Sequence, residues 1–196
     1  SKNYKKLFQW SINNIQLFWS SIWDYTNVKG KKTEKFHFSK EFIKNKFFVN
    51  SKLNFAENLL SKNNNEKAVT FISENGYKEI RSWRELNNNV SKITQFLRDI
   101  KIKKGDRIVA YMPNIIETVE AFIASVSLGA IWSSCSPDFG TKGVIERFSQ
   151  IKPKVLFVTK EYFYNGNQIH IFDRVSTIIK KIPSIKYVIV FNYPGQ

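Results

Sequence analysis

Residues 103–140 read KKGDRIVAYMPNIIETVEAFIASVSLGAIWSSCSPDFG, and this stretch decides the fold class of the chain. A continuous apolar run over 107–112 predicts a buried strand, and the apolar spacing over 115–126 predicts a helix. Gly129 is suited to the left-handed position that ends such a helix, and a short buried strand is expected at 130–133. Short apolar strands that alternate with helices indicate a parallel sheet with helices on both faces.

Two side-chain patterns mark the beginnings of helices. Asn114, which with Pro113 interrupts the first strand, predicts together with Glu117 a capped helix start. Ser82-Trp83-Arg84-Glu85 has the pattern of a capping box, and it predicts a helix that continues to about Asp99.

The alternation continues on both sides of the opening stretch. Asn75-Gly76 is the dipeptide favoured by a two-residue type I′ turn, so strands at 68–73 and 77–81 are expected to form a hairpin. Toward the carboxyl terminus the pattern predicts a helix at 141–151, a strand at 155–159, a helix at 172–182 stopped by Pro183, and a strand at 187–191. The expected fold class is α/β, with a helical N-terminal leader, a β-hairpin and an incomplete parallel sheet with flanking helices.

The first 60 residues have a different character. Apolar side chains recur in steps of three and four between Tyr4 and Tyr25, which predicts an amphipathic helix or a helix pair. A polar connection at 28–35, a short strand and turn within 36–49 and a short helix at 54–60 are expected to follow. We therefore expect a helical extension over 1–60 and an α/β domain over 61–196. A chain that starts at Ser1 and stops just after a strand is expected to be a fragment.

Composition excludes several classes of protein. The chain has 196 residues, of which 42% are hydrophobic, so it can form a core and is too apolar for intrinsic disorder. It has no apolar run long enough to span a bilayer, which argues against a membrane protein. One cysteine and two histidines exclude a disulfide framework and a structural zinc site, and they favour a reducing, cytoplasmic location.

The net charge of +15 raises the alternative of a basic nucleic-acid-binding module. Arginine, the residue that reads bases through bidentate contacts, occurs only six times, and the lysines are spread thinly. A solvated lysine-rich surface is therefore favoured, and neither a nucleic-acid nor a membrane partner is expected.

Ligands of open α/β sheets bind beyond the carboxyl ends of the strands, which here are followed by loops at 112–114, 134–140 and 160–168. No glycine-rich phosphate motif is present; Gly140 and Gly143 open a helix that could hold an anion, although a plain tight turn is favoured. Cys135 is expected to be buried and structural. His37 and His170 are too far apart in the sequence to suggest a shared site.

Residues 103–114 resemble the KKGDRV-x-x-YMPN segment of acyl-adenylate-forming enzymes of the acetyl-CoA synthetase type. Residues 128–140, LGAIWSSCSPDFG, are similar to the acetoacetyl-CoA synthetase branch of that family. The resemblance covers nearly the whole chain in the family's order. Further matching stretches lie at 18–23, 53–60, 147–157 and 164–166.

The resemblance implies a two-step ligase that joins acetoacetate to CoA through an acyl-adenylate, with ATP and CoA as co-substrates and Mg²⁺ assisting. A ligase for another short-chain acid, of the acetate or propionate type, remains the alternative. The nucleotide loop and the catalytic lysine of the family would lie beyond residue 196. The chain would therefore carry no catalytic residue and no metal ligand, would be inactive alone, and would need the missing C-terminal portion as its partner.

The resemblance also assigns site residues. The loop that follows Trp132 and the segment 164–166 would line the channel for CoA and the acyl group, while Asn167 replaces a lysine common in related enzymes. For Asp138 two hypotheses stand: its carboxylate caps the helix that begins near residue 141, or it shapes the channel. The implied channel residues are Pro137, Asp138, Phe139, Gly140, Tyr164, Asn165 and Gly166.

Overall fold

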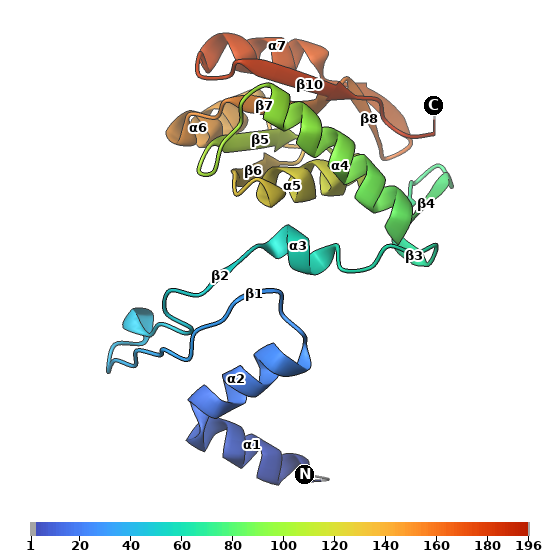
Figure 1. Ribbon diagram of the computed structural model, residues 1–196. Helices are drawn as coiled ribbons and strands as arrows, with labels where there is room; N and C mark the ends of the chain where they lie inside the picture. Colours follow the sequence, from blue (N-terminus) through green and yellow to red (C-terminus); the bar gives the residue numbers. More distant parts are fainter. Residues whose placement is uncertain (1–2, 196) are drawn as a thin grey trace. The chain divides into compact units, whose positions relative to one another are not determined.

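The computed structural model describes residues 3–195, which divide after Asn58 into two compact units, 3–58 and 59–195 (Figure 1). The second unit carries the parallel sheet and the candidate site. In chain order its strands are β3 (Lys67–Ile72), β4 (Lys78–Ser82), β5 (Arg107–Tyr111), β6 (Ile131–Cys135), β7 (Val155–Thr159), β8 (Glu161–Tyr164), β9 (Asn167–His170) and β10 (Tyr187–Phe191).

Four of these strands form one parallel sheet in the order β10-β7-β5-β6. The two central strands β5 and β7 consist almost entirely of buried residues, as the continuous apolar runs predict. β6 is longer than expected, because it reaches Cys135, and it is an edge strand with only that residue fully buried. The prediction of a short buried strand at 130–133 is therefore wrong in both extent and burial.

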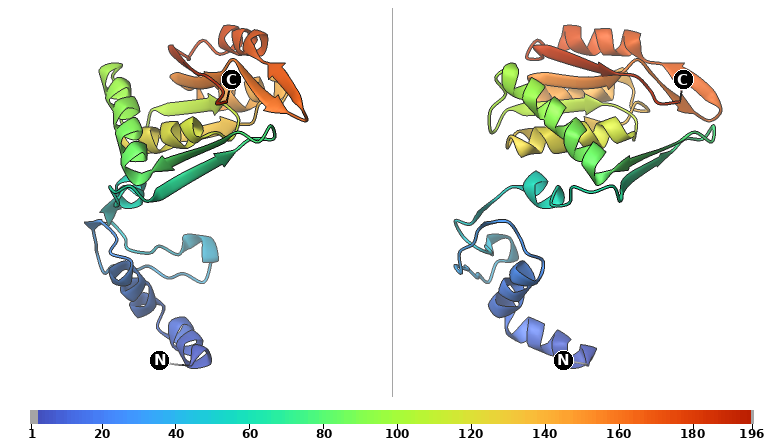
Figure 2. Two further views of the ribbon diagram at one scale, coloured as in Figure 1. Left: turned by 90° about the vertical axis from the view of Figure 1, so that its right-hand side faces the viewer. Right: turned by 45° about the vertical axis from the view of Figure 1, so that its right-hand side comes forward.

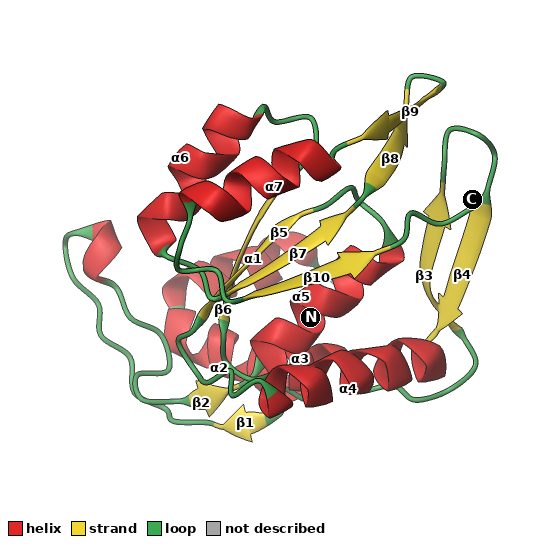
Figure 3. Ribbon diagram, turned by 90° about the horizontal axis from the view of Figure 1, so that it is seen from above, coloured by secondary structure: helices red, strands yellow, loops and turns green. Residues whose placement is uncertain are grey.

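Two helices cover each face of the sheet (Figure 3). α4 (Trp83–Asp99) and α5 (Ile116–Ser127) lie on one face, and α6 (Thr141–Ile151) and α7 (Phe172–Lys181) lie on the other. The α/β class expected from the sequence is confirmed. The core between these layers includes Leu86, Leu97, Ile108, Ile123, Phe148, Leu156, Phe157 and Ile178.

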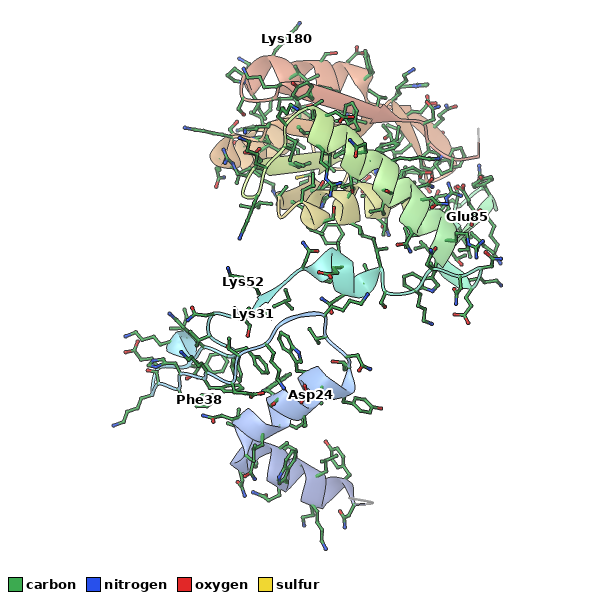
Figure 4. The ribbon with its side chains drawn as sticks, viewed as in Figure 1. Asp24, Lys31, Phe38, Lys52, Glu85 and Lys180 are labelled. Carbon is green, nitrogen blue, oxygen red and sulfur yellow. The ribbon has the colours of Figure 1, made fainter. Side chains whose placement is uncertain are left out.

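The expected helix ends are confirmed in two cases and wrong in one. Ser82 and Glu85, the latter labelled in Figure 4, form the complete capping box of α4, and Gly129 follows α5 with φ of 71°. Asn114, by contrast, does not cap α5: Ile115 is the N-cap, and no side chain bonds the first amides there. Instead the Thr118 hydroxyl donates to the carbonyl of Pro113 at 2.7 Å.

The dipeptide Asn-Gly forms the tips of both hairpins, in different turns. In the β3–β4 hairpin, the amide of Gly76 donates to the carbonyl of Ser73, and only Gly76 has positive φ, so the expected type I′ turn is wrong. The loop is a three-residue turn with glycine in the left-handed position. The predicted loop at 160–168 is instead the β8–β9 hairpin, in which Asn165 and Gly166 both have positive φ, as a type I′ turn requires.

The first unit has little core of its own. α1 (Tyr4–Asn13) and α2 (Ile15–Tyr25) form the expected helix pair, β1 (Gly30–Lys31) pairs with β2 (Lys52–Leu53), and a 3₁₀ turn η1 (Phe42–Lys44) and α3 (Phe55–Leu59) follow. Polar contacts link its segments, including the ion pair of 2.8 Å between Lys32 and Asp24, the latter labelled in Figure 4. Among residues 3–58 only Ala56 is fully buried.

Within residues 3–195 no helix combines the length and the apolar character needed to cross a membrane.

Candidate functional site

A cavity of about 240 Å³ lies at the carboxyl end of the sheet. All three loops expected there from the sequence contribute to it, together with the tip of the β3–β4 hairpin and a tyrosine that follows β10. Figure 3 shows both hairpins on the side to which the arrowheads of β7 and β10 point. The lining residues are Phe71, Ile72, Ser73, Glu74, Pro113, Asn114, Ile115, Ser136, Pro137, Asp138, Tyr162, Phe163, Tyr164 and Tyr193.

The loop after β6 contains a β-turn. The amide of Phe139 donates to the carbonyl of Ser136 at 3.1 Å, with Pro137 at the second position, where its fixed φ favours the turn. The buried hydroxyl of Tyr111 lies 2.9 Å from the carbonyl oxygens of both Pro137 and Phe139. Arg174 of α7 donates to the Pro137 carbonyl at 3.2 Å. Side chains of β5 and α7 thus bond the backbone carbonyls of the turn.

Asp138 is bonded to side chains and not to the helix that follows it. Its Oδ2 accepts from the Ser136 hydroxyl at 2.8 Å, and its Oδ1 accepts from the Tyr162 hydroxyl at 3.1 Å. Gly140 is the N-cap of α6, and no side-chain bond caps that helix. The capping hypothesis for Asp138 is therefore wrong: its carboxylate accepts from these two hydroxyls and from no amide at the start of α6. Burial and the bond to Asp138 raise the pKa of Tyr162.

Phe139 and Gly140 form the outer part of the same loop. The guanidinium of Arg147 stacks on the ring of Phe139, 4.3 Å from its centroid. Gly140 has an ordinary extended backbone, and a Cβ placed on it would meet no atom within 4 Å. The fold of the chain therefore does not itself require glycine at this position, and the space in front of it is open.

The tips of the two hairpins meet beside the cavity (Figure 2). The amide of Gly166 donates to Oε2 of Glu74 at 3.3 Å, which joins residues 92 positions apart in the sequence. Tyr164 lines the cavity, while Asn165 and Gly166 form the turn. The implied channel residues therefore come from two segments that the fold brings to one place.

Three lining residues, Phe71, Glu74 and Tyr193, lie outside the three loops predicted from the sequence and have no local sequence feature that marks them as part of a site. Phe71 and Tyr193 make an edge-to-face ring contact of 6.2 Å between centroids, although they are far apart in the chain. Tyr162 lies within the predicted loop 160–168, and the Asn165-Gly166 dipeptide is the signal that this loop forms a hairpin.

The cavity lining is acidic, whereas the protein as a whole is strongly basic. Glu74 and Asp138 are the only charged side chains among the lining residues, and no lysine or arginine is among them, although the whole chain has a net charge of +15. Such a lining does not attract phosphate groups, and it suits an uncharged part of a ligand.

Cys135 and the histidines lie outside this lining. Cys135 is buried, as expected, and burial raises the pKa of its thiol, which keeps it protonated and unreactive. His170 pairs with Glu161 across the β8–β9 hairpin at 2.7 Å, and His37 belongs to a backbone bridge with Lys46. In the described part of the chain no three His, Cys, Asp or Glu side chains form a group that could hold a metal ion.

Comparisons with known proteins agree with this architecture. Residues 56–192 match the family model described as AMP-binding enzyme. The chain is 39% identical over 196 residues to an acetoacetyl-CoA synthetase from Gallus gallus, covering 97% of this chain and 29% of that protein. An acetoacetyl-coenzyme A synthetase from Rhizobium meliloti is 39% identical over 181 residues, covering 92% and 28%.

A malonamoyl-CoA synthetase from Penicillium aethiopicum is 31% identical over 200 residues, covering 97% of this chain and 28% of that protein. The solved structure of acetoacetyl-CoA synthetase from Streptomyces lividans superposes with a TM-score of 0.92 at 29% identity, covering 99% of this chain and 31% of that one. The chain thus spans about 30% of the length of its relatives.

Proposed function

The chain belongs to the AMP-binding enzyme family, and we propose that it is the N-terminal part of a ligase that joins acetoacetate to CoA. In the first step a carboxylate oxygen of acetoacetate attacks the α-phosphate of ATP, which releases pyrophosphate and leaves an acyl-adenylate. In the second step the thiol of CoA attacks the acyl carbon, which gives acetoacetyl-CoA and AMP. The groups that carry out both steps are proposed to lie in the C-terminal portion of the protein.

The observation that carries this proposal is the agreement between one loop and the comparisons. The segment from Trp132 to Gly140 is the part of the sequence similar to the acetoacetyl-CoA branch, and in the structure it borders the cavity. Acetoacetate and malonamate, the acids named by the relatives, both carry a carbonyl group on the third carbon. The proposed substrate class is therefore a short carboxylic acid with a carbonyl at that position.

We assign Pro137, Asp138, Phe139, Gly140 and the hairpin tip 164–166 to the channel for CoA and the acyl group. The open space at Gly140 and the absence of basic side chains from the lining support a role in holding the pantetheine arm or the acyl group. The lack of basic side chains, including at Asn167, supports placing the phosphates of CoA elsewhere. Mg²⁺ belongs to the proposal for the full-length enzyme, and no step is assigned to it because the described residues offer no cluster for it.

The remaining features of the proposal concern the whole protein. We propose that residues 1–60 are an N-terminal extension and that 61–196 begin the AMP-binding domain. The single buried cysteine supports a reducing, cytoplasmic location.

A panel of acids tests the function in the full-length protein. Pyrophosphate release that depends on ATP and CoA is expected to be fastest with acetoacetate, followed by other acids with a carbonyl on the third carbon. A preference for acetate or propionate would favour the alternative ligase. Residues 1–196 alone are expected to give no acetoacetate-dependent pyrophosphate exchange above a heat-treated control.

The nucleic-acid alternative has its own test. Binding of a DNA duplex by residues 1–196 is expected to be weak at physiological salt. Retention on DNA that falls steeply as salt is raised would support a phosphate-binding surface, since phosphate contacts release counterions.

A further inference from the structure

We propose that Tyr111 and Arg174 are positioning residues of the candidate site, which hold the turn Ser136–Phe139 through two of its carbonyl groups. The inference rests on the proposed function, since it concerns the loop assigned there to the CoA and acyl channel. Neither residue lines the cavity. Both residues affect the cavity through the turn Ser136–Phe139, which lines it.

Tyr111 is the last residue of the central strand β5, and its side chain is completely buried. Its ring lies in the core, but its hydroxyl is 2.9 Å from the carbonyl oxygens of Pro137 and of Phe139. A phenylalanine would fill the same space in the core. What tyrosine adds over phenylalanine is thus a hydroxyl that bonds the turn. Without these carbonyl partners the buried hydroxyl would destabilise the fold.

Arg174 completes the arrangement from the other side. Its Nη1 donates to the Pro137 carbonyl at 3.2 Å, and contacts with the hydroxyls of Tyr111 and Tyr162 raise its pKa, so it remains charged. The Tyr111 hydroxyl has one proton to donate, but it faces two carbonyl oxygens. Because Arg174 supplies a donor to Pro137, the proton of Tyr111 is free to bond Phe139.

This anchoring determines what the turn presents on its outer side. With the carbonyls of Pro137 and Phe139 directed at Tyr111, the carboxylate of Asp138 bonds Tyr162 of β8, and the ring of Phe139 stacks under Arg147. β8 leads directly to the hairpin tip that holds the second group of proposed channel residues. Loosening the turn should therefore disturb both halves of the channel.

Hydrogen exchange on the 196-residue chain tests the structural part. In Tyr111→Phe and Arg174→Met we expect the amides of Asp138 and Phe139, both of which bond Ser136, to exchange about tenfold faster, while amides in β5 and β7 keep their protection, because only the turn is released. Tyr25→Phe, a hydroxyl deletion at an exposed tyrosine, and Arg84→Met, at an exposed arginine, are the matched controls. Equal acceleration in the turn and the core strands would indicate global destabilisation and would overturn the proposal, as would unchanged exchange in the turn.

Kinetics of the full-length protein test the link to function. Tyr111→Phe and Arg174→Met are expected to raise KM for CoA about tenfold and to change kcat by less than about twofold, since a misplaced binding loop weakens ground-state and transition-state binding alike. Arg174→Lys, which keeps a charged donor, is expected to restore part of the loss. An unchanged KM in folded variants would overturn the positioning role.

The two ways of failing can be told apart. If the wild-type full-length protein shows no CoA-dependent reaction with any acid of the panel, the proposed function fails, and the exchange experiment still decides whether the two residues hold the turn. If the wild type is active and the variants match it, the positioning inference alone fails.

Discussion

Arg81 of β4 and Glu120 of α5 form an ion pair inside the second unit, with Nε of Arg81 3.5 Å from Oε1 of Glu120. The same guanidinium pairs with Glu79 on its own strand and, through Nη2, with Oε1 of Glu117 at 3.4 Å. Asn89 of α4 donates to Glu120 at 2.9 Å. Arg81 therefore pairs with three carboxylates and connects the β3–β4 hairpin to α5, while Asn89 connects α4 to the same cluster through Glu120.

Replacing the cation of this cluster should be costly. Arg81→Met would leave the carboxylates of Glu79, Glu117 and Glu120 close together without a positive charge, and we expect it to lower the free energy of unfolding by about 3 kcal/mol. Urea denaturation at neutral pH measures the loss, with the exposed Arg84→Met as control. A change no larger than that of the control would show that the cluster contributes nothing to stability.

The carboxylates of the cluster should make stability depend on pH. Burial raises the pKa of Glu117 and of Glu120, and Oε2 of Glu117 has no hydrogen-bond partner. A raised pKa means that the folded state holds its proton longer than the unfolded state does, so the stabilisation is present at low pH and lost as pH rises through the raised value.

We therefore expect Glu117→Gln to become more stable than the wild type, by about 1 kcal/mol, as pH rises from about 4 to about 8. Groups with lowered pKa, such as Asp106, act in the opposite direction in both proteins and cancel in the difference. Urea denaturation across this range measures the effect, and Glu146→Gln at an exposed position is the control. A pH-independent difference would contradict the role of Glu117.

Asp138 should stabilise the hairpin and not the helix. Because its carboxylate accepts from Tyr162 and from Ser136, Asp138→Ala is expected to speed amide exchange in the β8–β9 hairpin while the first turn of α6 is unaffected. Asp138→Asn keeps an oxygen for Tyr162 and should have a milder effect. Faster exchange confined to the start of α6 would restore the capping hypothesis.

Two glycines should respond differently to substitution. Gly129 has φ of 71°, and a Cβ on it would lie 3.1 Å from Cγ of Lys104, so Gly129→Ala is expected to lower the free energy of unfolding by about 1 kcal/mol. Gly140→Val meets open space and should leave the melting temperature nearly unchanged, while it raises KM for CoA or acetoacetate in the full-length enzyme. Unchanged kinetics in a folded Gly140→Val protein would remove this loop from the proposed site.

Local sequence was sufficient for the elements whose causes are local. The apolar runs at 155–159 and 187–191 form the strands β7 and β10 at those positions, and the helix expected at 141–151 is α6. The capping box at Ser82 and the glycine after α5 also formed as expected, since each satisfies amides or a backbone angle within a few residues.

The two Asn-Gly dipeptides show where such reasoning stops. Both lie between short strands, but only Asn165-Gly166 adopts the two-residue type I′ turn, while Asn75-Gly76 belongs to a three-residue loop. The dipeptide permits both turns. The register of the strands, set by side chains across the sheet and beneath it, selects between them.

The sequence by itself determined the α/β class, the four strands of the parallel sheet in their order along the chain and the three loops that follow these strands, because hydrophobic periodicity and turn residues act over short distances. Only the tertiary structure decided that β6 lies at an edge, that Asp138 bonds Tyr162, and that Glu74 meets Gly166 beside the cavity. The two hydrogen bonds join residues 24 and 92 positions apart, and no local pattern could pair them, because the packing of the layers first has to bring the loops and hairpins together.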